Sequence, residues 1–181
     1  MYDNSKTNLE KKITFLKKSN NCYKFSFLLE NKNYILSSII EIDLINLIYK
    51  LNSDIYESFH SNKISDTESN ITLIMKKMLF DVITQKYAFL NIKKEVFEKE
   101  IIFNSKMITN YRPSCVNDRL ELVNVDSIIN KFELIDDHKA NCVVEFIFND
   151  LSSLNPILER IFVSIINKMF TRFKNFIEEL K

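Results

Sequence analysis

The sequence after Asn155 has the pattern of one long amphipathic helix that runs to the last residue. Asn155 can accept hydrogen bonds from the first free N–H groups of a helix, and Pro156 suits its first turn, where no N–H is needed. Each large apolar side chain contributes roughly 1.5–3 kcal/mol when it is buried, so this helix must cover a large apolar surface. Its apolar side chains recur every three or four residues, at Leu158, Phe162, Ile165, Met169, Phe173, Phe176 and Leu180.

The other side of this predicted helix is polar. Its basic residues Lys168, Arg172 and Lys174 indicate an ordinary solvated face, and contact with phosphate is the alternative. Charged residues interrupt the segment every few positions, so it cannot span a membrane. The pattern favours a helix that covers a core, and it leaves a membrane-surface or partner-helix role open.

Glycine is absent from the 181 residues, and there are only two prolines. Turns that need a positive φ must therefore use Asn, Asp or a strained residue. The same absence excludes the glycine-dependent phosphate loops, including the Walker and dinucleotide fingerprints. The net charge of +1 gives no reason to expect nucleic acid, and we expect no DNA partner. The length fits one domain with a full core.

The cysteines and histidines give no sign of a disulfide or a metal site. Cys22, Cys115 and Cys142 are far apart and form no C-x-x-C pair. Free thiols in a reducing compartment are therefore expected, and secretion is not. His60 and His138 have no metal-ligand spacing, so we expect no metal.

The order of the remaining patterns predicts an α+β protein. Residues 34–41 are interpreted as a strand, Asp43 as the cap of a helix that ends near 56–59, and residues 61–70 as a loop. An antiparallel sheet that curves around the terminal helix would leave a cavity between the two. Strands are expected at about 71–82, 85–94, 96–105, 118–125, 130–136 and 141–149, with breaks at Asn91, Asn104, 110–117 and 136–137.

Four segments of this chain carry a family resemblance. Residues 142–146 read C-x-V-x-F, and Phe162, Met169 and Phe173 follow at intervals of seven and four residues in the helix. In these features the chain resembles the coenzyme Q-binding branch of the START-like superfamily. That superfamily also includes polyketide cyclase-like domains and proteins related to a bacterial ribosome-association toxin.

Two of the four segments lie further upstream. Residues 130–134 resemble the N-x-W-x-F pattern of the family, with Phe132 in the place of Trp. Tyr56 and Phe59 keep the interval found in the family's D-V-x-x-Y-P-x-F segment. The Pro-Trp-Cys sequence that follows in the family is missing, and residues 125–127 replace its Gly-Pro-Phe turn.

The resemblance implies a helix-grip fold, in which a curved antiparallel sheet wraps around a long C-terminal helix. It covers a domain at residues 35–181. Residues 1–34 are set apart as an N-terminal extension, which is either an extra strand with alternating Tyr23, Phe25 and Phe27 or a weak targeting segment.

The resemblance also implies a function and a site. The expected function is non-enzymatic binding of a hydrophobic lipid, an isoprenoid quinone such as coenzyme Q (ubiquinone), in support of respiratory electron transport. No covalently bound cofactor is expected. The expected location is the matrix side of the mitochondrial inner membrane, with peripheral membrane contact, or a bacterial cytoplasm. The predicted ligand-binding residues are Tyr56, Phe59, Phe132, Phe146, Phe162, Met169 and Phe173.

Two other functions stay open on this fold. A cavity filled by bulky side chains would favour a protein-interaction role, with a ribosome or another large mitochondrial or bacterial assembly as partner. An enzyme of the cyclase type needs acid–base groups inside the cavity. The candidates are Glu145, His60, His138 and scattered tyrosines, and alternation along the strand predicts that Glu145 points away from the inner face. We therefore expect no enzymatic activity and no catalytic residue.

Overall fold

The structure is a computed structural model that describes residues 12–77, 85–149 and 154–181. Residues 1–11 of the predicted extension and the last part of the predicted strand 71–82 lie outside the described residues. The elements are β1 (Thr14–Ser19), β2 (Cys22–Glu30), α2 (Leu36–Ile39), α3 (Ile42–Lys50), β3 (Tyr56–Lys63), β4 (Glu68–Met75), β5 (Lys86–Phe97), β6 (Glu100–Met107), β7 (Glu121–Leu122), β8 (Val125–Asp136), β9 (Lys139–Phe148) and α4 (Pro156–Glu179).

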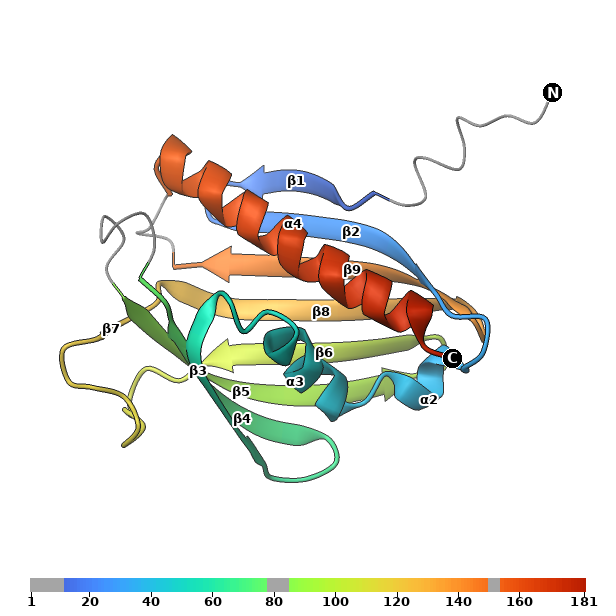
Figure 1. The fold of residues 1–181 in the computed structure, drawn as a ribbon, viewed down its shortest axis with the longest axis horizontal. Coiled ribbons are helices and arrows are strands. Elements are labelled where there is room, and N and C mark those ends of the chain that lie inside the picture. Colours follow the sequence, from blue (N-terminus) through green and yellow to red (C-terminus); the bar gives the residue numbers. More distant parts are fainter. Residues whose placement is uncertain (1–11, 78–84, 150–153) are drawn as a thin grey trace.

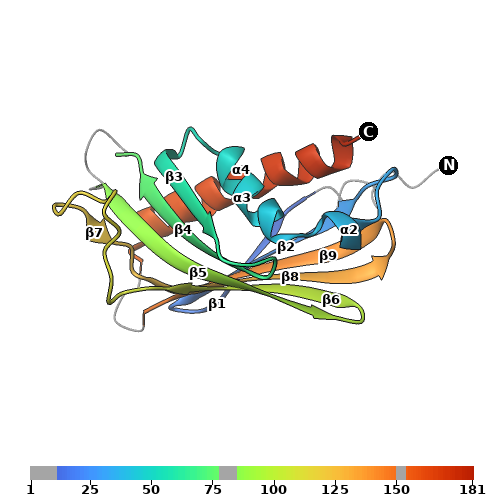
Figure 2. The same cartoon turned by 90° about the horizontal axis from the view of Figure 1, so that it is seen from below.

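The described strands form one sheet in the order β1-β2-β9-β8-β6-β5-β4-β3, with antiparallel neighbours throughout. The short strand β7 pairs in parallel with β5, off this path. α4 runs across the sheet (Figure 1), and the view from below shows all three helices on the concave face of a curved sheet (Figure 2). The predicted α+β architecture is confirmed.

Alternation along the strands decides which side chains enter the core. In β2, Tyr23, Phe25 and Phe27 are buried on the concave face while their neighbours are partly exposed, which confirms the predicted strand there. β2 pairs with β9 along its whole length, from Cys22 opposite Ile147 onward. The boundary placed at residue 34 therefore falls after two strands of the same sheet.

Both ends of α4 are fixed by asparagine side chains. The side-chain oxygen of Asn155 accepts hydrogen bonds from the backbone N–H groups of Ile157, at 3.1 Å, and Leu158, at 2.9 Å, which confirms the predicted cap. At the other end, the side-chain amide of Asn31 donates to the carbonyl of Ile177. Helices often end at a glycine, which lets the chain turn so that backbone N–H groups reach the last carbonyls of the helix. In a chain without glycine, an asparagine from the loop after β2 satisfies these carbonyls instead.

The prediction of a solvated basic face on α4 is wrong at Lys174, which is only 5% exposed. Its Nζ donates hydrogen bonds to the backbone carbonyl of Leu28 on β2 and to the carboxylate of Glu178. A lysine can lay its aliphatic stem along apolar surface and still place its ammonium group on polar partners. Lys174 therefore ties the second half of α4 to the sheet.

Two local predictions between residues 34 and 59 are wrong. The segment interpreted as a strand contains α2, in which Leu36 is fully buried, and Ile40 directly after the helix is fully buried four residues on. α3 begins at Ile42 with Glu41 at its N-cap position and no side-chain cap, so Asp43 does not cap it. The aliphatic run favours a strand by local propensity, but burial against the core overrides that preference.

The predicted end of the helix near residues 56–59 and the predicted loop at 61–70 are also wrong. β3 begins at Tyr56, and only a short turn separates it from β4. Most side chains of β3 are exposed because it is an edge strand, so it lacks the apolar alternation by which strands are recognised.

In the second half of the chain, most strand predictions are confirmed with shifted ends. The breaks expected at Asn91 and Asn104 are wrong, because both residues lie inside strands. Their side-chain amides donate across the sheet, Asn91 to Asn70 at 2.9 Å and Asn104 to Glu95 at 3.0 Å. The loop at 110–117 is confirmed, the turn expected at 136–137 lies one residue later at 137–138, and the strand expected at 118–125 is reduced to β7.

Asp54 joins the turn after α3 to two cations of α4. Lys168 donates to it at 2.8 Å, and Arg172 makes a two-pronged contact. The hydrogen bond from Arg172, followed by that from Lys168, holds the pKa of Asp54 well below its usual range. A depressed carboxyl pKa contributes stability above the unfolded-state value of about 3.9 and loses it as the pH falls toward the folded-state value.

We therefore expect Asp54→Asn to lower the melting temperature slightly at pH 7 and to flatten the loss of stability below about pH 4. The effect is small because the contact is about half exposed and screened by water. Thermal denaturation of both proteins from pH 7 to about pH 2 measures this. Parallel curves over the whole range contradict the assignment.

Candidate functional site

An apolar cavity of about 510 Å³ lies between the first half of α4, α3 and the concave face of the sheet. This volume falls in the range of ligand pockets, about 300–1,000 Å³. The space under the terminal helix is therefore hollow. Its apolar lining consists of Ile45, Ile48, Tyr49, Ile55, Tyr56, Leu73, Met75, Ala88, Leu90, Met107, Val123, Val125, Ile128, Phe146, Phe148, Leu154, Leu158, Ile161, Phe162, Ile165, Ile166, Met169 and Phe170.

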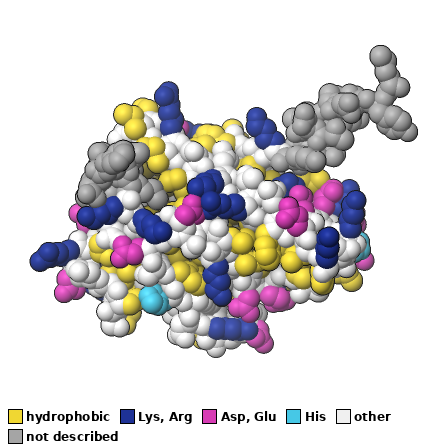
Figure 3. Space-filling model, viewed as in Figure 1, with side chains coloured by type: hydrophobic (Ala, Val, Ile, Leu, Met, Phe, Trp, Pro, Cys, Tyr) yellow, Lys and Arg dark blue, Asp and Glu magenta, His cyan; other side chains and the backbone are white. Residues whose placement is uncertain are grey.

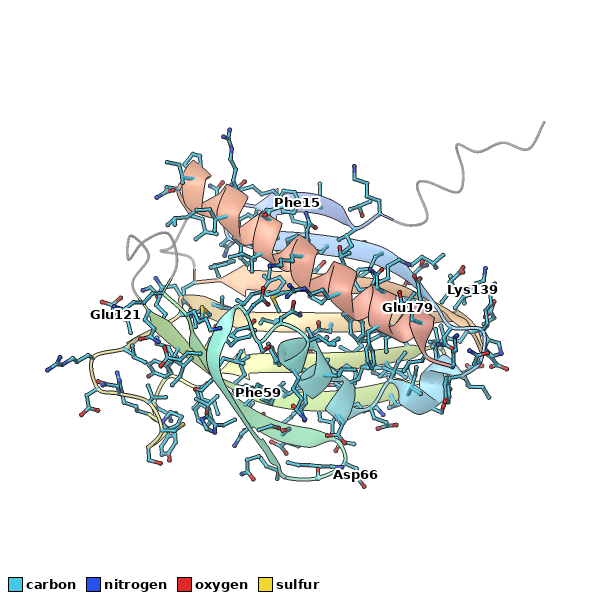
Figure 4. All side chains as sticks on the ribbon, in the orientation of Figure 1. Phe15, Phe59, Asp66, Glu121, Lys139 and Glu179 are labelled. Carbon is cyan, nitrogen blue, oxygen red and sulfur yellow. The ribbon has the colours of Figure 1, made fainter. Side chains whose placement is uncertain are left out.

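One end of the cavity is its mouth. Two lining residues there, Asn124 and Asn155, are exposed to solvent. Lys86 also lines this end, and its Nζ pairs with Glu121 at 2.8 Å. Figure 4 shows Glu121 at the end of the molecule where β7 lies, and Lys139 at the opposite end. The cavity therefore opens at the β7 end.

The other end of the cavity is closed by aromatic rings. Along β8, inward-facing residues from Val125 through Ile128 to Asn130 line it in turn. The next inward-facing residue, Phe132, packs edge-on against Phe103 with ring centroids 6.0 Å apart. Both rings are buried, so the cavity ends at Asn130.

Four of the seven predicted site residues line the cavity, namely Tyr56, Phe146, Phe162 and Met169. The hydroxyl of Tyr56 lies 3.5 Å from the sulfur of Met169, so two residues far apart in the sequence meet at the inner wall. Burial raises the pKa of Tyr56 well above its ordinary value, and the nearby Tyr49 adds to the shift. The Tyr56 hydroxyl is therefore neutral at any physiological pH.

Phe162 lies at the centre of an aromatic cluster beside the cavity. Its ring centroid is 5.2 Å from that of Phe146, 5.4 Å from those of Tyr23 and Phe148, and 6.0 Å from that of Phe25, all in edge-to-face arrangements. Such aromatic pairs contribute about 0.5–1.5 kcal/mol each beyond area burial. The cluster fixes α4 to β2 and β9 and so holds the cavity wall in place.

The other three predicted residues lie behind the lining. Phe59 on β3 stacks on the lining residue Tyr49 of α3 with ring centroids 5.7 Å apart, so it supports the cavity wall from behind. Phe132 packs against Phe103, and the two rings close the inner end of the cavity. Phe173 is fully buried against Phe27, between α4 and β2. Direct contact of these three with a ligand stays a prediction.

Sequence reasoning missed three important residues of the lining. Tyr49 lies on α3, and helical periodicity does not distinguish a side chain that lines a cavity from one that packs in a core. Ala88 is a small residue among bulky ones on β5, and strand periodicity gives no signal for an empty space next to it. Asn130 could have been found, because alternation with Ile128 and Phe132 places a polar side chain on the apolar face.

Of the acid–base candidates, Glu145, His60 and His138 do not line the cavity in the part of the chain that the structure describes, whereas the tyrosines Tyr49 and Tyr56 do. Glu145 points away from it, as predicted, and pairs with Lys18 of β1 at 2.8 Å. The Nδ1 atom of His138 lies 2.8 Å from the carbonyl oxygen of Asn31, and His60 is exposed on β3. Among the described residues, no group of three or more His, Cys, Asp or Glu could hold a metal ion.

The outer face of α4 carries charges of both signs. Figure 3 shows cationic and anionic side chains interspersed on this side of the molecule. Lys168 and Arg172 are bound to Asp54, and Lys174 is buried, so the three candidate cations for phosphate contact already have protein partners. Within residues 12–77, 85–149 and 154–181, no helix is long and apolar enough to cross a membrane.

No family model and no curated protein matches this sequence. Solved structures do match. Human StAR-related lipid transfer protein 5 is 12% identical with a TM-score of 0.60, over 96% of this chain and 86% of that one. The lipid transfer and protein localization domain of human StarD13 (DLC2) is 10% identical with a TM-score of 0.62, over 99% and 100%. A STAR-related lipid transfer protein from Xanthomonas axonopodis is 9% identical with a TM-score of 0.62, over 91% and 98%.

At such low identity these matches establish the fold alone. The chain has the START-like helix-grip fold, a curved antiparallel sheet that holds a long C-terminal helix. The predicted fold is therefore confirmed. The likeness is in the fold and does not single out a coenzyme Q-binding protein.

Proposed function

We propose that this protein is a non-enzymatic carrier that binds one neutral hydrophobic ligand under α4. The observation that carries the proposal is the hollow, apolar cavity in a chain with 15 phenylalanines, enough bulk to fill it. Protein interiors are normally close-packed, and an apolar void lowers stability. A void of this size is therefore best explained by a ligand that occupies it. The three similar solved structures, which are lipid transfer proteins or domains by name, support the same class of ligand.

An isoprenoid quinone is the ligand that we propose within this class. Its branched tail needs a dry apolar lining with few polar contacts, which the cavity offers. The residues shared with the coenzyme Q-binding branch include Tyr56, Phe146, Phe162 and Met169, and all four line the cavity. Support of respiratory electron transport, with peripheral contact at the inner membrane, belongs to the same proposal and rests on that resemblance.

The protein-interaction alternative depended on a cavity filled by bulky side chains. The cavity is hollow, so that argument for association with a ribosome or another large assembly is lost. The enzymatic alternative has no carboxylate or histidine among the described lining residues, since Glu145, His60 and His138 lie elsewhere. Tyr49 and Tyr56 do line the cavity, but burial raises the pKa of both hydroxyls, and Lys86 at the mouth pairs with Glu121. These observations favour the carrier.

We expect protein purified from a quinone-producing host to contain about one prenylquinone per chain, released by organic extraction and identified by mass spectrometry. Phe162→Asp should remove it, because an ionised carboxylate in an apolar lining has no partner there. Ser164→Asp on the exposed side of α4 is the matched control and should keep the lipid. Another neutral lipid in place of quinone would correct the ligand class, and folded wild-type protein without any lipid would contradict the carrier.

A further inference from the structure

The inner end of the cavity holds one polar side chain that has no partner among the described residues. Asn130 lines the cavity and is only 6% exposed. Its side-chain amide makes no hydrogen bond with any residue that the structure describes. Its neighbours on the sheet are apolar, Phe103 on β6 and Val144 on β9. The amide faces the open space of the cavity. Leaving an amide unpaired once water is displaced from that space costs about 1–3 kcal/mol, so a ligand that fills the inner end needs a polar atom here.

The other buried asparagines show that this is an exception. Asn31 donates to the end of α4, Asn46 contacts Asp43, and Asn52 donates to the carbonyl of Ile48 at 2.7 Å. All three are paired, as buried amides normally are. Among the buried asparagines of the described chain, only Asn130 makes no side-chain hydrogen bond. The Oδ1 atom of the partly buried Asn167 also lacks a partner there, but Asn167 does not line the cavity.

The charges around the cavity restrict the chemistry of a ligand at Asn130. Lys86 is the only charged side chain among the described lining residues, and it lies at the mouth, paired with Glu121. A carboxylate or phosphate placed at the inner end would therefore have no cation to compensate for the loss of water. A neutral carbonyl oxygen needs only a donor, and the Asn130 amide supplies two N–H groups.

We infer that Asn130 recognises the polar head of the ligand, which enters the cavity head first. The inference rests on the proposed function and deepens it. A neutral carbonyl oxygen accepts a hydrogen bond from Asn130 Nδ2 at the closed end, and the apolar tail extends along α4 toward Asn124 and Asn155 at the mouth. The ligand class is thus a neutral lipid with a carbonyl head, such as a quinone, and not a fatty acid or a phospholipid.

Ser105 supplies a control next to this site. Its Oγ is buried without a partner in the described structure, but Ser105 is not part of the cavity lining. It lies diagonally from Asn130 on the concave face, because Ser105 pairs with Ile128 and Asn130 with Phe103. Ser105→Ala therefore removes a nearby unpaired polar group that the ligand does not reach.

The test uses displacement of N-phenyl-1-naphthylamine, a neutral fluorescent probe of apolar cavities. Decylubiquinone and decylbenzene serve as competitors, because both have a ring and a decyl tail but only the quinone carries carbonyl oxygens. In the wild type, decylubiquinone should displace the probe more strongly than decylbenzene does. Asn130→Leu should weaken the binding of decylubiquinone about 3- to 10-fold, the effect of one lost hydrogen bond. The binding of decylbenzene should stay unchanged or improve. Ser105→Ala should behave as the wild type does.

The outcomes separate this inference from the proposed function. If the wild type binds neither the probe nor the competitors, the carrier proposal fails. If both bind but Asn130→Leu keeps the preference for the quinone, the inference is overturned. It is also overturned if Ser105→Ala loses the preference for the quinone as much as Asn130→Leu does. The same holds if Asn124→Leu at the mouth loses the preference and Asn130→Leu keeps it. Melting curves verify folding, and Asn130→Ala repeats the comparison if the leucine variant does not fold.

Discussion

Replacing Ala88 by phenylalanine should abolish ligand binding and leave the protein folded. Ala88 is buried on β5, and its methyl group faces the cavity. A phenyl ring at this position can extend into empty space, where it gains contacts with the apolar lining without displacing packed atoms. We expect the melting temperature to stay the same or rise. Displacement titration with N-phenyl-1-naphthylamine should show at least about a 10-fold loss of affinity, roughly 1.4 kcal/mol.

The matched control is the same substitution at Ala140. This residue is also buried on the concave face, but on β9, where it lies opposite Leu29 and Leu134 and outside the cavity lining. A phenyl ring there must push packed atoms apart, which costs about 1–3 kcal/mol or more. Ala140→Phe should therefore lower the melting temperature, whereas Ala88→Phe should not. Equal destabilisation by both variants would show that the space next to Ala88 is not empty.

Phe173→Ala should lower the stability of the folded protein by a large amount, more than Phe162→Ala or Asp54→Asn. The Phe173 ring is fully buried between α4 and the sheet and contacts Phe27. Removing a buried phenylalanine ring costs about 3–5 kcal/mol, because the surroundings collapse only partly into the space that is left. Urea denaturation measures the change as a lower transition midpoint at unchanged slope. The folded fraction should bind the probe as the wild type does.

Phe162→Ala is the comparison on the same helix. Phe162 is only partly buried and borders the cavity, so its removal should cost less stability than removal of Phe173. It should also weaken the binding of the probe, because one wall of the cavity is lost. If Phe173→Ala instead impaired binding with little loss of stability, Phe173 would be a ligand contact, as the family resemblance implies.

The terminal strand and helix could be predicted because their signals are local. Asn155, Pro156 and the apolar stripe after them determine the start of α4 and its buried face, and alternation determines β9. The partners of the polar residues could not be predicted in this way. Helical periodicity places Lys174 on the polar side, but β2 and Glu178 enclose it, and this depends on contacts between segments far apart in the chain.

The site could be predicted only in part, for a related reason. An apolar residue at strand or helix spacing faces inward whether it packs in a core or lines a cavity. Phe162 and Phe173 share the same stripe, yet only Phe162 borders the cavity. The difference arises from the volume left by Ala88 and the position of α3, and neither has a local signal. Asn130 is the exception, because a polar residue in an apolar stripe can be recognised from the sequence.

The carrier function requires that the cavity under α4 hold one neutral hydrophobic ligand. Native mass spectrometry of the wild type and Ala88→Phe, each incubated with decylubiquinone, measures this occupancy. We predict one added ligand mass per wild-type chain and none on Ala88→Phe, with both proteins folded. A wild-type protein that stays free of ligand, or two proteins that bind it equally, would contradict the carrier function.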